Sequence, residues 1–60
     1  MIDDFLDGMR KHLKEDMDLL ADIICDSRGE KYFAELIEIY HNMKQTYDNL
    51  SKAIKKIRRG

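Results

Sequence analysis

Apolar residues in the second half of the chain recur at alternating intervals of three and four. The intervals continue without a break for nearly four heptads, from Phe33 to Ile57. This pattern predicts one long α-helix with an apolar seam along one side. The seam consists of Phe33, Leu36, Tyr40, Met43, Tyr47, Leu50, Ile54 and Ile57.

The first half also carries apolar residues at helical spacing, in a less regular order. Its stripe comprises Leu6, Met9, Leu13, Met17, Leu20 and Ile24, with Phe5, Leu19 and Ile23 beside it. The chain has no proline, and its β-branched residues are mostly isoleucines at helical intervals. Strands are therefore not expected, and the fold class is predicted to be all-α.

A reversal of the chain is predicted between the two stripes. On one straight helix at 100° per residue, the stripes would point about 150° apart, whereas a turn lets them face each other. Gly29 can adopt the left-handed conformation that ends a helix. Ser27 and Glu30 have the spacing of a capping box, which would start one. We therefore predict a single domain over residues 1–60, an antiparallel hairpin made of helix 3–26, turn 27–29 and helix 30–58.

Near the turn, the apolar stripes are wider than a two-helix seam requires. On the second helix they span about 160°, an arc that one neighbouring helix cannot cover. A chain of 60 residues also usually needs a disulfide, a metal or a partner to be stable. We predict that the hairpin dimerises into a four-helix bundle. The residues expected at that interface are Leu19, Ile23, Tyr32, Ile37 and Ile39.

The net charge of −1 conceals a separation of charge along the chain. Residues 15–38 hold eight acidic residues against two basic ones, and the outer segments hold nine basic residues against four acidic ones. An antiparallel dimer would place the acidic turn of each copy beside the basic end of the other. Exposed charges are individually weak, so parallel, swapped and heteromeric bundles remain alternatives.

The pattern favours a small protein–protein interaction module of the adaptor, co-chaperone or inhibitor type. It would act by helix–helix packing, with itself or with a helical partner protein. The alternative is a bundle that contacts the phosphates of RNA or DNA through a basic face of the second helix. The residues of that face are Lys52, Lys55, Lys56 and Arg59. The pI of about 6.0 gives this alternative little support.

Catalytic and metal chemistry are not expected. Glu38 and His41 have the E-x-x-H spacing of helical metal sites, but on a helix they point away from the apolar seam. His12 and Asp16 lie one turn apart, yet no nucleophile or glycine-rich phosphate loop accompanies them. We therefore predict no enzyme activity, no cofactor, no metal and no small-molecule substrate.

Cys25 is the only cysteine, so no internal disulfide is expected. A lone thiol suits a reducing cytoplasm better than secretion. No apolar run approaches the length of a membrane span, and no membrane association is predicted.

Overall fold

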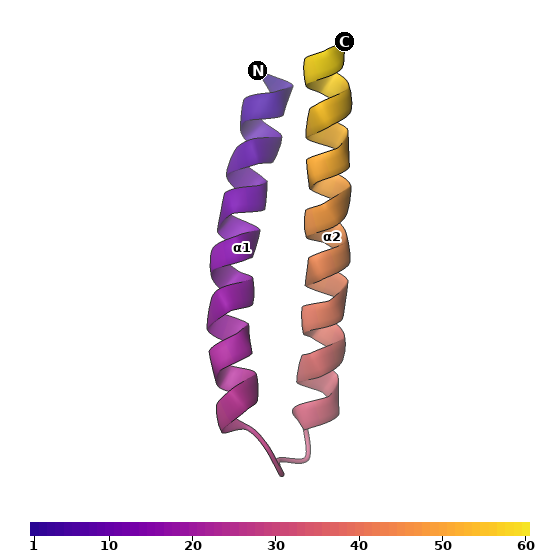
Figure 1. The fold of residues 1–60 in the computed structure, drawn as a ribbon. Coiled ribbons are helices and arrows are strands. Elements are labelled where there is room, and N and C mark those ends of the chain that lie inside the picture. Colours follow the sequence, from indigo (N-terminus) through magenta and orange to yellow (C-terminus); the bar gives the residue numbers. More distant parts are fainter.

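The computed structural model describes all 60 residues and contains two helices. Helix α1 spans Ile2–Asp26 and helix α2 spans Phe33–Arg59. They run side by side in opposite directions, with the turn at one end and both termini at the other (Figure 1). No strand is present. The predicted all-helical, antiparallel hairpin is confirmed.

The connection between the helices is longer than the predicted turn, and α2 begins at Phe33 rather than at residue 30. The backbone of this segment turns twice after α1 ends. The N–H of Glu30 donates to the carbonyl of Ser27 at 3.0 Å, and the N–H of Phe33 donates to the carbonyl of Glu30 at 3.2 Å. Gly29 is the third residue of the first turn, with φ 88°, the left-handed conformation expected of it.

Ser27 closes the first helix and does not cap the second. Its hydroxyl donates to the carbonyl of Ile23 at 2.6 Å, and its backbone N–H donates to that of Ile24 at 3.1 Å. These bonds satisfy carbonyls that the end of a helix leaves unpaired. The capping box that the spacing of Ser27 and Glu30 suggested does not form, because the hydroxyl is used within α1.

The hairpin encloses very little. Ile54, 2% exposed, is its only fully buried apolar residue. The other apolar positions between the helices are half-buried, except Met9 and Ile57, which are exposed. Met17 and Tyr40, expected opposite each other, line the same shallow depression between the helices.

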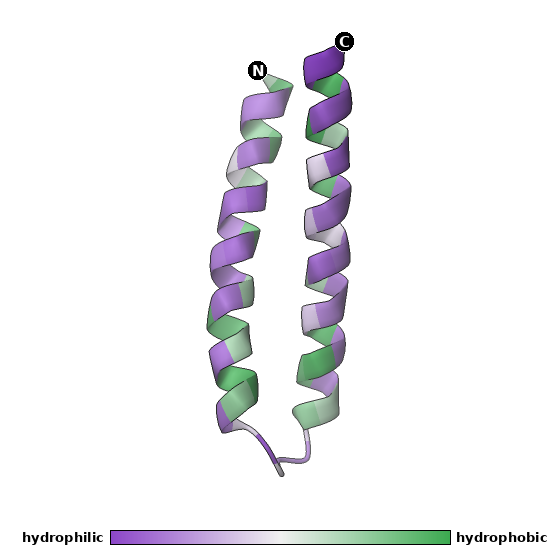
Figure 2. Cartoon of the chain, in the orientation of Figure 1, coloured by the Kyte–Doolittle hydropathy of each residue, from purple (hydrophilic) through white to green (hydrophobic).

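Ten large hydrophobic side chains remain exposed. They are Met1, Ile2, Phe5, Met9, Leu19, Ile23, Tyr32, Ile37, Ile39 and Ile57. The halves of both helices next to the turn are the more hydrophobic, whereas the C-terminal end of α2 is strongly hydrophilic (Figure 2).

The two internal glycines should respond oppositely to alanine. A Cβ at Gly8, in the middle of a regular turn of α1, would meet nothing within 4 Å, so Gly8→Ala should stabilise the helix by about 1 kcal/mol. Gly29→Ala should destabilise by about 1 kcal/mol, because its positive φ suits only glycine. Thermal unfolding at one fixed protein concentration should show midpoints shifted by about 4–8 °C in opposite directions.

Candidate interaction faces

The hairpin has two broad faces, one on each side of the plane that holds both helices. Ala21 and Ile24 from α1 and Ile37 and Tyr40 from α2 line an apolar depression of about 210 Å³ on one of them. We call the side that contains this depression the depression face. The opposite side is the stripe face.

Helical geometry places the other exposed apolar residues of the turn half on the stripe face. Leu19 and Ile23 each lie two residues from Ala21, which is about 160° around α1. Ile39 is separated from Ile37 by the same rotation around α2. The three are therefore on the side away from the depression.

The predicted interface set is thus divided between the two faces. Leu19, Ile23 and Ile39 are 63%, 51% and 49% exposed on the stripe face. Tyr32, the residue before α2, lies two helical turns from Ile39 and on the same side. Ile37, 46% exposed, belongs to the depression face instead.

The exposed stripe on α1 extends to the N-terminal end of the helix. Ile2, Phe5 and Met9 are exposed as well, and they share the rotational position of Leu19 and Ile23. Together the five follow heptad intervals, with His12 and Asp16 occupying the two middle positions. The spacing was visible in the sequence, but the polar pair interrupts the apolar run and hides its continuity.

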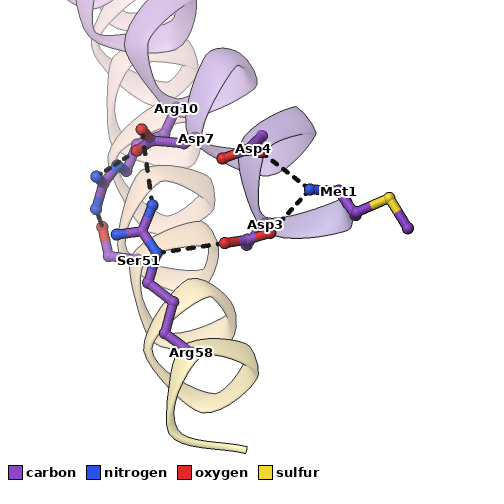
Figure 3. Close-up of polar contacts among 7 residues, drawn as sticks. All are labelled: Met1, Asp3, Asp4, Asp7, Arg10, Ser51 and Arg58. Carbon is purple, nitrogen blue, oxygen red and sulfur yellow. Dashed lines mark hydrogen bonds and ion pairs between the residues drawn. The ribbon is translucent and has the colours of Figure 1, made fainter.

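The open end of the depression face is polar and connects the two helices. Arg10 places Nη2 2.6 Å from Oδ1 of Asp7 and donates from Nη1 to Oγ of Ser51 at 3.2 Å. Its guanidinium also lies 6.0 Å from the centre of the Tyr47 ring, within the range of a cation–π contact. Arg10 therefore joins α1 to two successive turns of α2, and Figure 3 shows its contacts with Asp7 and Ser51.

Arg58 forms a second connection at the same end. Its Nε lies 3.6 Å from Oδ2 of Asp3, and its Nη2 lies 4.0 Å from Oδ2 of Asp7. The amino group of Met1 donates to Asp4 at 2.9 Å and to Asp3 at 3.2 Å. The hydrogen bond to Asp4, then that to Asp3, raises the pKa of the ammonium, and the bond from the ammonium lowers the pKa of Asp3. The acidic start of α1 is thus largely occupied by nearby cations.

The four basic residues predicted for nucleic-acid contact remain unpaired. Lys52, Lys55, Lys56 and Arg59 are all exposed, and none lies within 4.0 Å of a carboxylate. Lys55 and Arg59 line a depression of about 400 Å³ together with Arg58 and Ser51. Lys55 and Arg59 therefore lie toward the depression face, whereas Lys52 and Lys56 lie on the outer side of α2, opposite the buried Ile54.

The remaining polar candidates form no clustered site. Glu38, His41, His12 and Asp16 are exposed, and nowhere do three or more His, Cys, Asp or Glu side chains gather closely enough to hold a metal ion. The thiol of Cys25 is free and exposed. Neither helix has the length and apolarity that a membrane crossing would require.

The chain matches no protein-family model, no curated protein and no solved structure. Its function is therefore inferred from the chemistry of its two faces.

Arg10→Ala should loosen the open end of the hairpin. It removes an ion pair within α1 and a hydrogen bond between the helices, so we expect a loss of about 1 kcal/mol in the free energy of unfolding. Lys11→Ala is the matched control, because Lys11 is exposed and forms no ion pair. Urea unfolding should separate the two variants. Equal midpoints would contradict the role given to Arg10.

Proposed function

We propose that this protein is a protein–protein interaction module of the adaptor, co-chaperone or inhibitor type. It acts by helix–helix packing and self-associates into a four-helix bundle. One observation carries the proposal: a single apolar side chain is buried, whereas ten large hydrophobic ones are exposed. Exposed apolar surface on this scale marks a site that another protein covers.

The size of the stripe face supports association. The Cα positions extend over 47 by 15 Å in the plane of the hairpin, which encloses about 700 Å². Side chains at the edges widen this area. A specific interface typically buries about 800 Å² on each partner, so one face of the hairpin is large enough for a stable complex.

The stripe face also has the composition of an interface core. Aliphatic and aromatic side chains fill its two ends, and they are the groups whose burial stabilises a complex most. The occupant can be a second copy or a helix of another protein, since both present the same kind of surface. We place the protein in the cytoplasm, where an exposed free thiol such as that of Cys25 stays reduced.

Analytical ultracentrifugation of the unmodified protein tests the proposal directly. We expect a mass of twice the chain's 7.2 kDa at micromolar concentration. Leu19→Asp should raise the dissociation constant about 100-fold, because it removes about 1.5 kcal/mol of apolar burial from each of two copies. Sedimentation over a dilution series measures this change.

Ile37→Asp is the matched comparison on the opposite face. Ile37 and Leu19 are both aliphatic and half-exposed, so the same substitution tests which face associates. We expect Ile37→Asp to lower the stability of the hairpin without the 100-fold change in association. A single-chain mass for the unmodified protein at all concentrations would disprove self-association.

A second candidate function, binding of RNA or DNA, is favoured by the unpaired bases of α2. Four cations without carboxylate partners retain their full charge for phosphate oxygens. Lys55 and Arg59 lie toward the depression face, so a dimer formed through the stripe face leaves these two accessible.

Fluorescence anisotropy with labelled RNA and DNA tests this second function. If phosphates are bound, affinity should fall steeply between 50 and 200 mM salt, and replacement of Lys52, Lys55, Lys56 and Arg59 by glutamine should abolish it. Lys11→Gln and Lys14→Gln serve as controls on the other helix. Absence of binding at 50 mM salt would exclude this function.

A further inference from the structure

The stripe on α1 is symmetric about position 14. Its positions at equal distances on either side of this point carry matching residues: Phe5 with Ile23, Met9 with Leu19, and His12 with Asp16. A two-fold axis through the middle of the stripe would therefore set apolar against apolar and a base against an acid. The seventh stripe position, Ile2, falls opposite Asp26 at the end of the helix.

We infer that a second copy of this chain covers the stripe face, with α1 packed antiparallel on α1 of the other copy in this one register. Each Phe5 then faces Ile23 of the other copy, each Met9 faces Leu19, and His12 faces Asp16. The inference rests on the proposed self-association and specifies its face, direction and register. In an antiparallel helix pair, an a position of one helix faces a d position of the other. Residues 9, 16 and 23 form one of these two sets and residues 5, 12 and 19 the other, so each of the three pairings joins one member of each set.

The polar pair in the middle fixes the register. A shift by one heptad in one direction brings His12 against Ile23 and Asp16 against Leu19. A shift in the other direction brings them against Met9 and Phe5. Each shift places polar groups against apolar ones without a partner, which is costly. Polar residues at single core positions select register in helical bundles in this way, at some cost in stability.

The second helix is compatible with the same axis. An axis through position 14 of α1 crosses α2 near position 45, because Asp26 ends α1 and Phe33 begins α2 at the turn end of the hairpin. Placed midway between positions 44 and 45, the axis pairs Tyr32 with Ile57, Leu36 with Ala53, Ile39 with Leu50, and Met43 with Thr46.

Three of these four pairings join only apolar or aromatic residues. The fourth, Met43 with Thr46, lies next to the axis, at the level of the polar pair on α1. Both helices therefore have polar groups at the centre of the face and apolar groups on both sides.

The charge distribution favours the same direction. The turn end of the chain carries a formal charge of −6 over residues 15–38, and the outer segments carry +5. In the antiparallel assembly each acidic turn lies beside the basic open end of the other copy. A parallel assembly would set the two acidic ends together.

Cysteine pairs test the register. In a Cys25→Ser background, Met9→Cys with Leu19→Cys should yield a covalent dimer on mild oxidation, because the two thiols face each other across the axis. Either substitution alone should not, since equal positions then lie about 15 Å apart along the helices. An equimolar mixture of the two single variants should again yield covalent dimer. Non-reducing electrophoresis measures the yield.

The outcomes separate the two proposals. If the unmodified protein sediments as a dimer but the double-cysteine variant forms no covalent dimer, or a single variant does, the register is wrong while self-association stands. If the unmodified protein sediments as a single chain, self-association itself fails, and the register with it.

A charge exchange tests the pair at the centre. His12→Glu sets a carboxylate against Asp16 of the other copy, and should raise the dimer dissociation constant about tenfold. His12→Glu combined with Asp16→Lys restores opposite charges and should return the constant to within about threefold of the unmodified value. The pair within one chain, four residues apart, affects helix stability but not the dimer mass. An unchanged constant in the single variant would overturn the inferred pairing.

Discussion

Two helices lying side by side meet along a line and cannot enclose a volume. Each helix buries one side against the other and leaves the rest of its circumference open. In this protein Ile54 is the only apolar residue that is fully buried. The width of the apolar stripes then determines how much hydrophobic surface is exposed. Where a stripe is wider than the seam between the two helices, its outer residues stay exposed unless a further helix packs on them.

The two ends of the hairpin are held by different interactions. At the turn, backbone hydrogen bonds and the hydroxyl of Ser27 close α1, and Gly29 supplies the conformation that reverses the chain. At the open end, Arg10 and Arg58 reach across between α1 and α2. The first set of contacts is local in sequence and insensitive to salt. The second joins residues far apart in the sequence, 41 positions in the case of Arg10 and Ser51, and its ion pairs weaken as salt screens exposed charges.

Most of the fold followed from the sequence, because the signals are local. Heptad spacing specifies a helix over any few turns, and one glycine between two stripes specifies a reversal. The start of α2 at Phe33 did not follow. The hydroxyl of Ser27 could either accept a hydrogen bond from the N–H of Glu30, which would start α2, or donate one to a carbonyl at the end of α1. It does the second, and the sequence spacing alone does not decide between them. The placement of Ile37 on one face of the hairpin, and of Leu19 and Ile39 on the other, also did not follow. The angular width of the apolar arc on a helix does not specify which face of the hairpin each edge of that arc belongs to. The bridging role of Arg10 depends on where a long side chain reaches, which no spacing rule specifies.

The nearly empty interior described above has a cellular consequence. A chain whose apolar surface is covered only by a second chain has a folded fraction that depends on its own abundance. If the hairpins pair as proposed, unpaired copies at low abundance are the more readily unfolded and cleaved by proteases, whereas pairing at high abundance protects them. The proposed pairing would then link the lifetime of the protein to its own concentration.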